Sequence, residues 1–204
     1  MQTNVKNRGR RQLLGIMALF LLPPVLAWIA WYYLDTYGVS TSSNAGTLIQ
    51  PARPLSYVGL MAENQHQSFD FSVLQGRWYY VLYAGAGCRA ACQEQLYVTR
   101  QIRIGVNKDI PRVKRLLITK RPLSTTLHTQ LTEQHPDLFI ARQAVDDTAE
   151  AWLKPFQGAN FDASGDYYFL VDPIGNVMMF YDAQVPPKGI LRDLQKLLKV
   201  SQVG

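Results

Sequence analysis

The sequence predicts an α/β domain that follows a single N-terminal transmembrane helix. Three features lead to this prediction: a long uncharged apolar segment near the N-terminus, alternating strand-like and helix-like stretches from residue 55 onward, and a final pair of strand-like stretches around a Pro/Gly turn. The 204 residues have room for an anchor and one domain with a sizeable core. Because 48% of the residues are apolar and only 18% are charged, the chain is expected to fold rather than to be disordered.

The apolar segment covers residues 13–34 and contains no charged residue in 22 positions. At about 1.5 Å per helical residue it can cross a hydrocarbon core of about 30 Å. Pro23 and Pro24 lie near its centre and are expected to kink the helix or remove hydrogen bonds from it. The apolar region of a signal peptide has only about 7 to 15 residues, so the segment is interpreted as an uncleaved anchor.

The formal net charge of +6 is concentrated before this anchor. Lys6, Arg8, Arg10 and Arg11 precede it, and without them 17 of the 21 basic residues remain against 15 acidic ones. The rest of the chain is therefore nearly neutral and lacks the charge of a nucleic-acid-binding domain. Basic residues mark the cytoplasmic side of a span. Residues 1–12 are thus predicted to be a cytoplasmic tail of a single-pass bacterial inner-membrane protein, with its domain in the periplasm.

Residues 35–54 are small and polar with Gly and Pro, and are predicted to be a linker to a domain at 55–204. In that domain, strands are predicted at 77–83, 113–119, 138–141, 167–171 and 177–181, and helices from 88 to about 104, within 123–135, at 146–153 and at 187–200. Crossover connections imply parallel strands early and an antiparallel pair at the end. This order is typical of a thioredoxin-like domain.

Cys88 and Cys92 are the only cysteines, and they lie where the first predicted core strand leads into a helix. At a spacing of i, i+4 on a helix the two sulfurs can meet on one face. A helix N-terminus favours the thiolate, and Arg89 adds positive charge. A thiolate is both the nucleophile of disulfide exchange and a soft ligand for Cu(I). A third interpretation is a structural disulfide, but closing a five-residue loop stabilises a fold only weakly.

Around these residues the sequence resembles the SCO/SenC family of membrane-anchored, thioredoxin-like proteins that assemble the copper site of cytochrome c oxidase. The likeness rests on residues 76–78 before the first core strand, on the Cys88-x-x-x-Cys92 pair, and on residues 168–175, Tyr-Phe-Leu-Val-Asp-Pro-Ile-Gly. It implies that Cys88 and Cys92 are metal-binding thiolates for copper. It also implies partners at the inner membrane, either a respiratory oxidase subunit or other copper-assembly proteins.

One family feature is missing from this sequence. The third copper ligand of the family is a histidine shortly before the last strands, and Ala163, which has no donor atom, stands at that position. His66, His128 and His135 are each expected to be solvated surface residues. Neighbouring residues of a strand face opposite ways, so at least one of Met178 and Met179 is expected to pack in the core.

Three functions follow from this combination. In the first, the protein is an oxidase assembly factor that acts by thiol–disulfide exchange on copper-site cysteines. Cys88, expected to be the more exposed cysteine, would attack, and Cys92 would resolve the mixed disulfide. In the second, the two thiolates carry Cu(I). In the third, the chain is a non-catalytic assembly scaffold.

Overall fold

The computed structural model describes residues 3–36, 44–56, 58–63, 69–85, 87–145, 151–158 and 167–201, with the side chains of 3–9 and 34–36 left out. The chain divides into two compact units, Met1–Ser43 and Asn44–Gly204. Ala163, His66 and residues 146–150 lie outside the described residues, so the structure gives no account of them.

The first unit contains one long helix, α1 (Thr3–Thr36), which continues through Pro23 and Pro24. Within it, Arg10–Tyr33 is the candidate span of 24 residues, and its most apolar 18-residue window has a mean hydropathy of 2.3. This stretch is long enough and apolar enough to span a membrane. Its apolar side chains are exposed along the whole segment, in contrast to those of a core helix.

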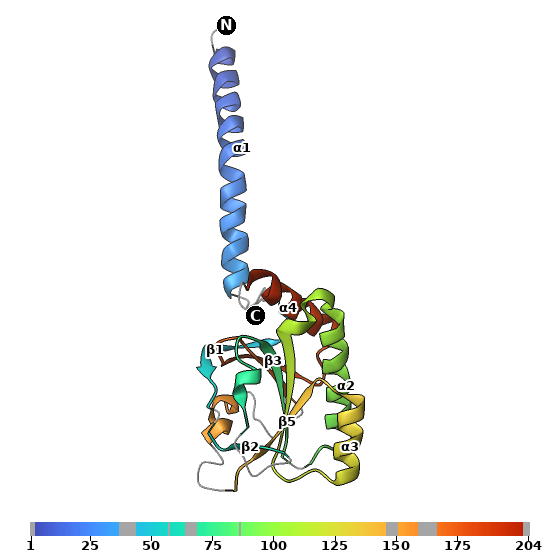
Figure 1. The fold of residues 1–204 in the computed structure, drawn as a ribbon. Helices are drawn as coiled ribbons and strands as arrows, with labels where there is room; N and C mark the ends of the chain where they lie inside the picture. Colours follow the sequence, from blue (N-terminus) through green and yellow to red (C-terminus); the bar gives the residue numbers. More distant parts are fainter. Residues whose placement is uncertain are drawn as a thin grey trace. The chain divides into compact units, whose positions relative to one another are not determined.

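The second unit is built on one seven-stranded mixed sheet (Figure 1). The strands are β1 (Thr47–Pro54), β2 (Leu60–Ala62), β3 (Trp78–Ala84), β4 (Val113–Thr119), β5 (Leu138–Gln143), β6 (Tyr167–Val171) and β7 (Asn176–Asp182), in the spatial order β1-β7-β6-β3-β4-β5-β2. The central strands β3, β4 and β5 are parallel, and every other pair is antiparallel. The expected early parallel strands and late antiparallel pair are both present.

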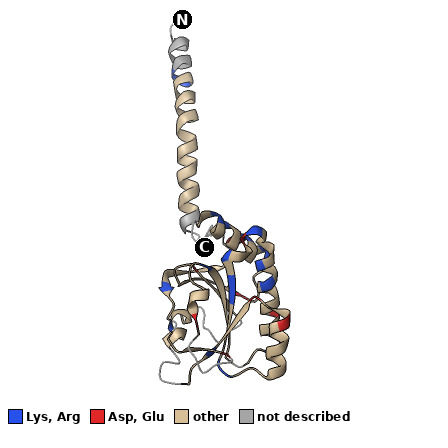
Figure 2. Cartoon of the chain, viewed as in Figure 1, with Lys and Arg blue, Asp and Glu red and all other residues tan. Residues whose placement is uncertain are grey.

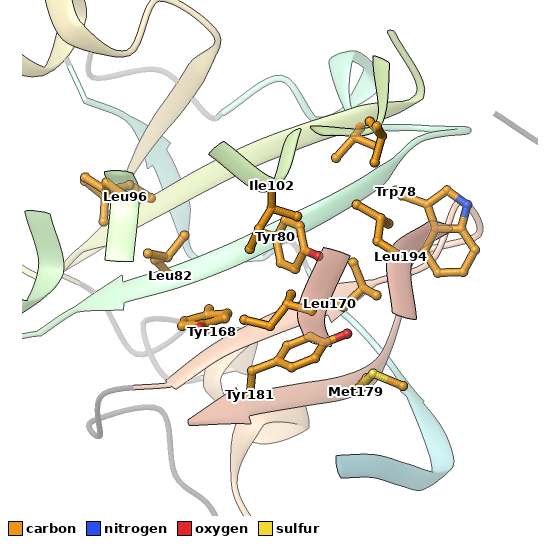
Figure 3. Close-up of a cluster of buried hydrophobic side chains, with 14 of the residues drawn as sticks. Trp78, Tyr80, Leu82, Leu96, Ile102, Tyr168, Leu170, Met179, Tyr181 and Leu194 are labelled. Carbon is orange, nitrogen blue, oxygen red and sulfur yellow. The ribbon is translucent and has the colours of Figure 1, made fainter. Parts of the chain in front are cut away.

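Each face of the sheet has its own apolar core. On one face lie α2 (Ala90–Gly105), α3 (Thr125–Gln134) and α4 (Pro187–Val200), as Figure 1 shows. Figure 3 shows this core, in which Tyr80 of β3 and Leu194 of α4 are buried. The other face is covered partly by a 3₁₀ helix, η3 (Ala151–Phe156), whose Trp152 packs with Tyr79 in a second cluster. Alternate residues of β3 therefore support different cores, because successive side chains of a strand face opposite ways.

The turn between β6 and β7 has the predicted hairpin geometry. The Oδ1 atom of Asp172 accepts hydrogen bonds from the backbone N–H groups of Ile174 and Asn176, at 3.0 and 2.8 Å. Gly175 has a φ of 93°, in the left-handed region that glycine tolerates best. The two strands around this turn and helix α4 agree with the sequence predictions within one residue.

The interpretation of residues 35–54 as a linker was wrong in its second half. Thr47–Pro54 forms β1, which pairs antiparallel with β7 at the edge of the sheet. The register shifts between Leu48 and Arg53. Pro51 lies inside this interval and has no N–H group to donate, which is typical of an edge strand. Its two prolines made this segment look like a tether in the sequence.

Candidate functional site

The cysteine pair lies where β3 leads into α2. A turn at Gly85 follows β3, and Gly87, with a φ of 93°, precedes Cys88. Cys88 and Cys92 are joined in a disulfide with their Cα atoms 5.1 Å apart. Cys92 belongs to the 16-residue helix α2, and the disulfide joins Cys88, in the segment between β3 and α2, to this helix. The predicted position of the cysteine pair, between a core strand and a helix, is confirmed.

Two details of the predicted site were wrong. The helix begins at Ala90 with Arg89 as its N-cap, so Cys88 lies just before the helix rather than in it. Cys88 is also not the more exposed cysteine: it is 5% exposed and belongs to the core cluster beneath α2, whereas Cys92 is half-buried. A sulfur that precedes the helix turns into the core under it, while Cys92, in the first helical turn, lies closer to solvent.

The first turn of α2 offers an electropositive setting for a sulfur anion. Arg89 provides no side-chain cap for the helix, and the first turn contains no acidic residue. The first N–H groups of a helix have no partner within the helix and carry partial positive charge. After reduction, the sulfur of Cys92, which lies in this first turn, would be beside donors that favour a thiolate.

A hollow of about 450 Å³ lies between α2 and α3. Gln93, which follows Cys92, lies on its wall, and the Nε2 of Gln93 donates to the carbonyl of Cys88 at 3.4 Å. Tyr97, Arg100 and His135 line it further along.

The expectation that the histidines are solvated was wrong for His135. It is 6% exposed and its Nδ1 lies 3.5 Å from Nη2 of Arg115. Burial, and then the positive charge of Arg115, lower the pKa of His135 below its ordinary value of 6.5. Of the other two, His128 is half-buried, and His66 is outside the described residues. Met179 is a core residue, as one of the two methionines was expected to be.

Arg115 itself is a buried charge that the sequence did not reveal. This β4 side chain is fully buried and donates from Nε and Nη2 to both carboxylate oxygens of Asp137, each at 2.9 Å. Its Nη1 donates to the carbonyl of Leu96 on α2 at 2.7 Å. Burial raises the pKa of the Asp137 carboxyl, but the hydrogen bonds and charge of Arg115 outweigh it and hold the pKa below the usual range. The pair ties β4 to α2, which carries Cys92.

Among the described residues, His, Cys, Asp and Glu side chains form no group of three that could hold a metal ion. The two sulfurs are joined to each other, so a metal ion would bind them only after reduction. They would then supply two soft thiolate ligands, a donor set that suits Cu(I).

Comparisons with known proteins agree with this arrangement. Residues 78–201 match the family model described as "Transmembrane-like, thioredoxin-like, C-terminal domain". Yeast Sco1 with copper bound aligns with a TM-score of 0.59 at 16% identity, over 75% of this chain and 96% of that one. Arabidopsis thaliana ScoI with copper bound aligns at 0.55 and 14% identity, over 72% and 100%.

A DsbF homologue from Corynebacterium diphtheriae aligns at a TM-score of 0.51 and 11% identity, over 77% of this chain and 96% of that one. No curated protein matches the sequence. At such low identities the structural likenesses establish the fold alone, and this fold is the predicted α/β, SCO-like thioredoxin fold. Because the family model covers more than half of the chain, and α1 is apolar enough to span a membrane, the chain belongs to the family of transmembrane-like, thioredoxin-like C-terminal domains.

Proposed function

We propose that this protein is a thiol–disulfide exchange factor for the assembly of the copper site in a respiratory cytochrome c oxidase. The observation that carries the proposal is the Cys88–Cys92 disulfide, formed between the end of a central strand and the first turn of α2. Solved structures of the same fold include copper-bound Sco proteins and a DsbF homologue. These relatives support a role in copper-site assembly or redox chemistry.

In the proposed reaction the reduced protein gives two electrons to a partner disulfide. The thiolate of Cys92, the more exposed sulfur, attacks one partner sulfur, forms a mixed disulfide and releases the other partner sulfur as a thiolate. Cys88 then attacks the Cys92 sulfur, which releases the second partner thiolate and forms the Cys88–Cys92 disulfide. The partner ends as a dithiol ready to bind metal, and the protein ends in the oxidised state of this structure.

The proposal places the reaction at the outer face of a bacterial inner membrane. The four basic residues before α1 support a cytoplasmic N-terminus. The domain would then face the periplasm, where disulfide chemistry proceeds.

The test compares oxidase activity in cells that carry full-length variants. Cys88→Ser with Cys92→Ser is expected to abolish the contribution of this protein to oxidase assembly, whereas Ala91→Ser, in the same loop, is expected to preserve it. Cys88→Ser alone is expected to accumulate a mixed disulfide through Cys92, seen by mass spectrometry of the trapped complex. Full oxidase activity with the double variant would contradict thiol exchange and leave only a scaffold function. A mixed disulfide that is trapped in Cys92→Ser but not in Cys88→Ser would make Cys88 the attacking cysteine and Cys92 the resolving one.

The same cysteines favour a second candidate, a Cu(I) carrier, because two adjacent thiolates form a soft donor pair. Anaerobic titration of the reduced full chain with Cu(I) against a chelator of known affinity separates the two. Tight one-to-one binding that the double serine variant loses would favour the carrier. Without such binding, thiol exchange is the remaining chemistry of the pair.

A further inference from the structure

Helix α4 carries a row of exposed cations that the proposed redox function does not use. Lys188, Arg192 and Lys199 are exposed and spaced four and seven residues apart, which places them on one helix face. Figure 2 shows the basic residues on this helix. Lys196 is also exposed and lies next to the row. We call Lys188, Arg192, Lys196 and Lys199 the basic face of α4.

Helix α4 packs on the sheet through its opposite face, which does not contain these cations. Ile190, Leu194 and Leu198 are buried against the sheet. Asp193 is the one acidic residue of the helix and is 2% exposed, so the exposed charged side chains of α4 are all cationic. Outside the N-terminal tail the chain is nearly neutral, with 17 basic and 15 acidic residues, so this concentration of charge is local. Such a face is suited to an anionic surface.

Asp193 also fixes α4 to the start of the domain. Its Oδ2 accepts hydrogen bonds from the backbone N–H groups of Ala45 and Gly46, at 2.7 and 2.9 Å. The last residue of α1 is Thr36. Nine residue steps separate Thr36 from Ala45, and an extended chain covers at most about 32 Å over that number. The basic face is therefore tethered within a short reach of the membrane that holds α1.

We infer that the basic face of α4 binds the anionic phospholipid headgroups of that membrane. The occupant is identified by two facts: the charge is complementary, and the short tether keeps the headgroups at a high local concentration. Val200, at the end of the same helix, is 82% exposed and offers an apolar contact for the interface. The inference rests on the membrane span and is independent of the chemistry proposed for the cysteines.

The full chain in lipid nanodiscs provides the test. The two native cysteines are bonded to each other, so a Gln195→Cys substitution on the same helix face gives a single site for a fluorescent donor. Headgroup-labelled acceptor lipid is incorporated into nanodiscs of phosphatidylcholine alone or mixed with phosphatidylglycerol. Energy transfer is expected to be higher in the anionic nanodiscs. The difference is expected to vanish at about 1 M salt, where the Debye length is about 3 Å.

Charge-reversal variants assign the effect to α4. Each cation near an anionic surface changes the ratio of bound to free domain about fivefold, so Lys188→Glu with Arg192→Glu is expected to lower that ratio by at least about 25-fold. The matched control, Lys120→Glu with Lys154→Glu, changes the charge equally at exposed residues of other elements and is expected to preserve the transfer. All four side chains are exposed, so both variants are expected to fold, and circular dichroism checks this.

Two outcomes would overturn the inference. Equal transfer in neutral and anionic nanodiscs at low salt would show that the lipid charge has no effect, and would leave an acidic protein as the partner for α4. An equal loss in the two charge-reversal variants would show that net charge, rather than this face, determines the position of the domain. Neither outcome would affect the thiol exchange proposed for Cys88 and Cys92.

Discussion

At the scale of single residues, the buried polar groups around Arg115 determine how the domain responds to pH. His135 lies within 3.5 Å of the Arg115 guanidinium and is almost fully buried, and both facts disfavour its protonated form. When the protonated form of a histidine is disfavoured only in the folded state, the unfolded state binds the proton more tightly. Protonation therefore favours unfolding. His135 is therefore a pH-sensitive residue next to the pair that ties β4 to α2.

The expected result is a loss of stability between neutral and mildly acidic pH. The folded-state pKa of His135 is below the unfolded value of 6.5, so its contribution is fully present above 6.5 and is lost as the pH falls through 6.5 toward the folded pKa. Asp137 does not contribute to the change in this pH range. Its pKa is lowered, so its contribution to the free energy of unfolding is lost only in stronger acid. Denaturant titrations of the reduced and oxidised domain at several pH values between about 5 and 8 measure the effect.

Two substitutions assign this pH dependence to one histidine. His135→Gln is expected to flatten the free energy of unfolding between pH 8 and 5. His128→Gln, on the same α3 segment but only half-buried, is expected to retain the slope. An unchanged slope in His135→Gln would assign the proton uptake to another group.

The sequence did not allow these residue roles to be predicted. His135 follows a polar helix and precedes Pro136, so its sequence context is that of a surface residue. In the structure it lies buried beside Arg115, twenty positions earlier. The Cys88–Cys92 pair could be predicted because the two cysteines and the strand–helix junction that holds them lie close together in the sequence. Which of the two is more exposed depends on where α2 begins, and sequence patterns place helix ends only to within a few residues.

At the scale of elements, β1 and α4 hold each other in place. Ala45 and Gly46, directly before β1, donate hydrogen bonds to the buried carboxylate of Asp193. The side chain of Tyr181 lies so close to Gly46 that a Cβ atom there would clash with it. The strand then covers the edge of β7. The segment before β1 is thus held by contacts with a helix almost 150 residues further along the chain.

Removing this carboxylate is expected to loosen β1. Asp193→Ala leaves the N–H groups of Ala45 and Gly46 without their acceptor and is expected to lower the free energy of unfolding by about 2 kcal/mol. Asp193→Asn keeps one acceptor oxygen and is expected to cost less. Gln195→Ala, exposed on the same helix, serves as the control. Hydrogen exchange should become faster in β1 first, and unchanged exchange there would contradict the role of Asp193.

Elements with a strong local pattern were predicted well, and elements held by distant partners were not. Local composition and residue spacing predict the buried strand β4, the hairpin of β6 and β7, and the amphipathic helix α4. By contrast, β1 contains two prolines, and β2 has three residues. Both are edge strands whose structure comes from pairing with β7 and β5. Pairing of this kind joins positions far apart in the chain and has no local signature.

At the scale of the whole molecule, the chain joins a membrane-spanning helix to a domain with its own two apolar cores. The disulfide is at the carboxyl end of β3, next to the parallel strand β4. Among the side chains that the structure describes, those of the two cores come from residues 49–198. We expect the anchor to act by raising the local concentration of the domain at the membrane.

This separation can be tested with a chain that lacks residues 1–43 and is exported to the periplasm by a cleavable signal peptide. Because residues 44–204 form one compact unit, the shortened chain is expected to fold and to react with a small disulfide at the rate of the full chain. Its support of oxidase assembly is expected to fall by at least about tenfold at equal abundance, since tethering raises the effective concentration of the cysteines at a membrane-bound partner. Fusion of an unrelated single span with the same linker is expected to restore assembly. Full oxidase activity with the shortened chain would mean that the domain reaches its partner by diffusion. If the unrelated span did not restore assembly, the sequence of α1 itself would have to recognise a partner within the membrane.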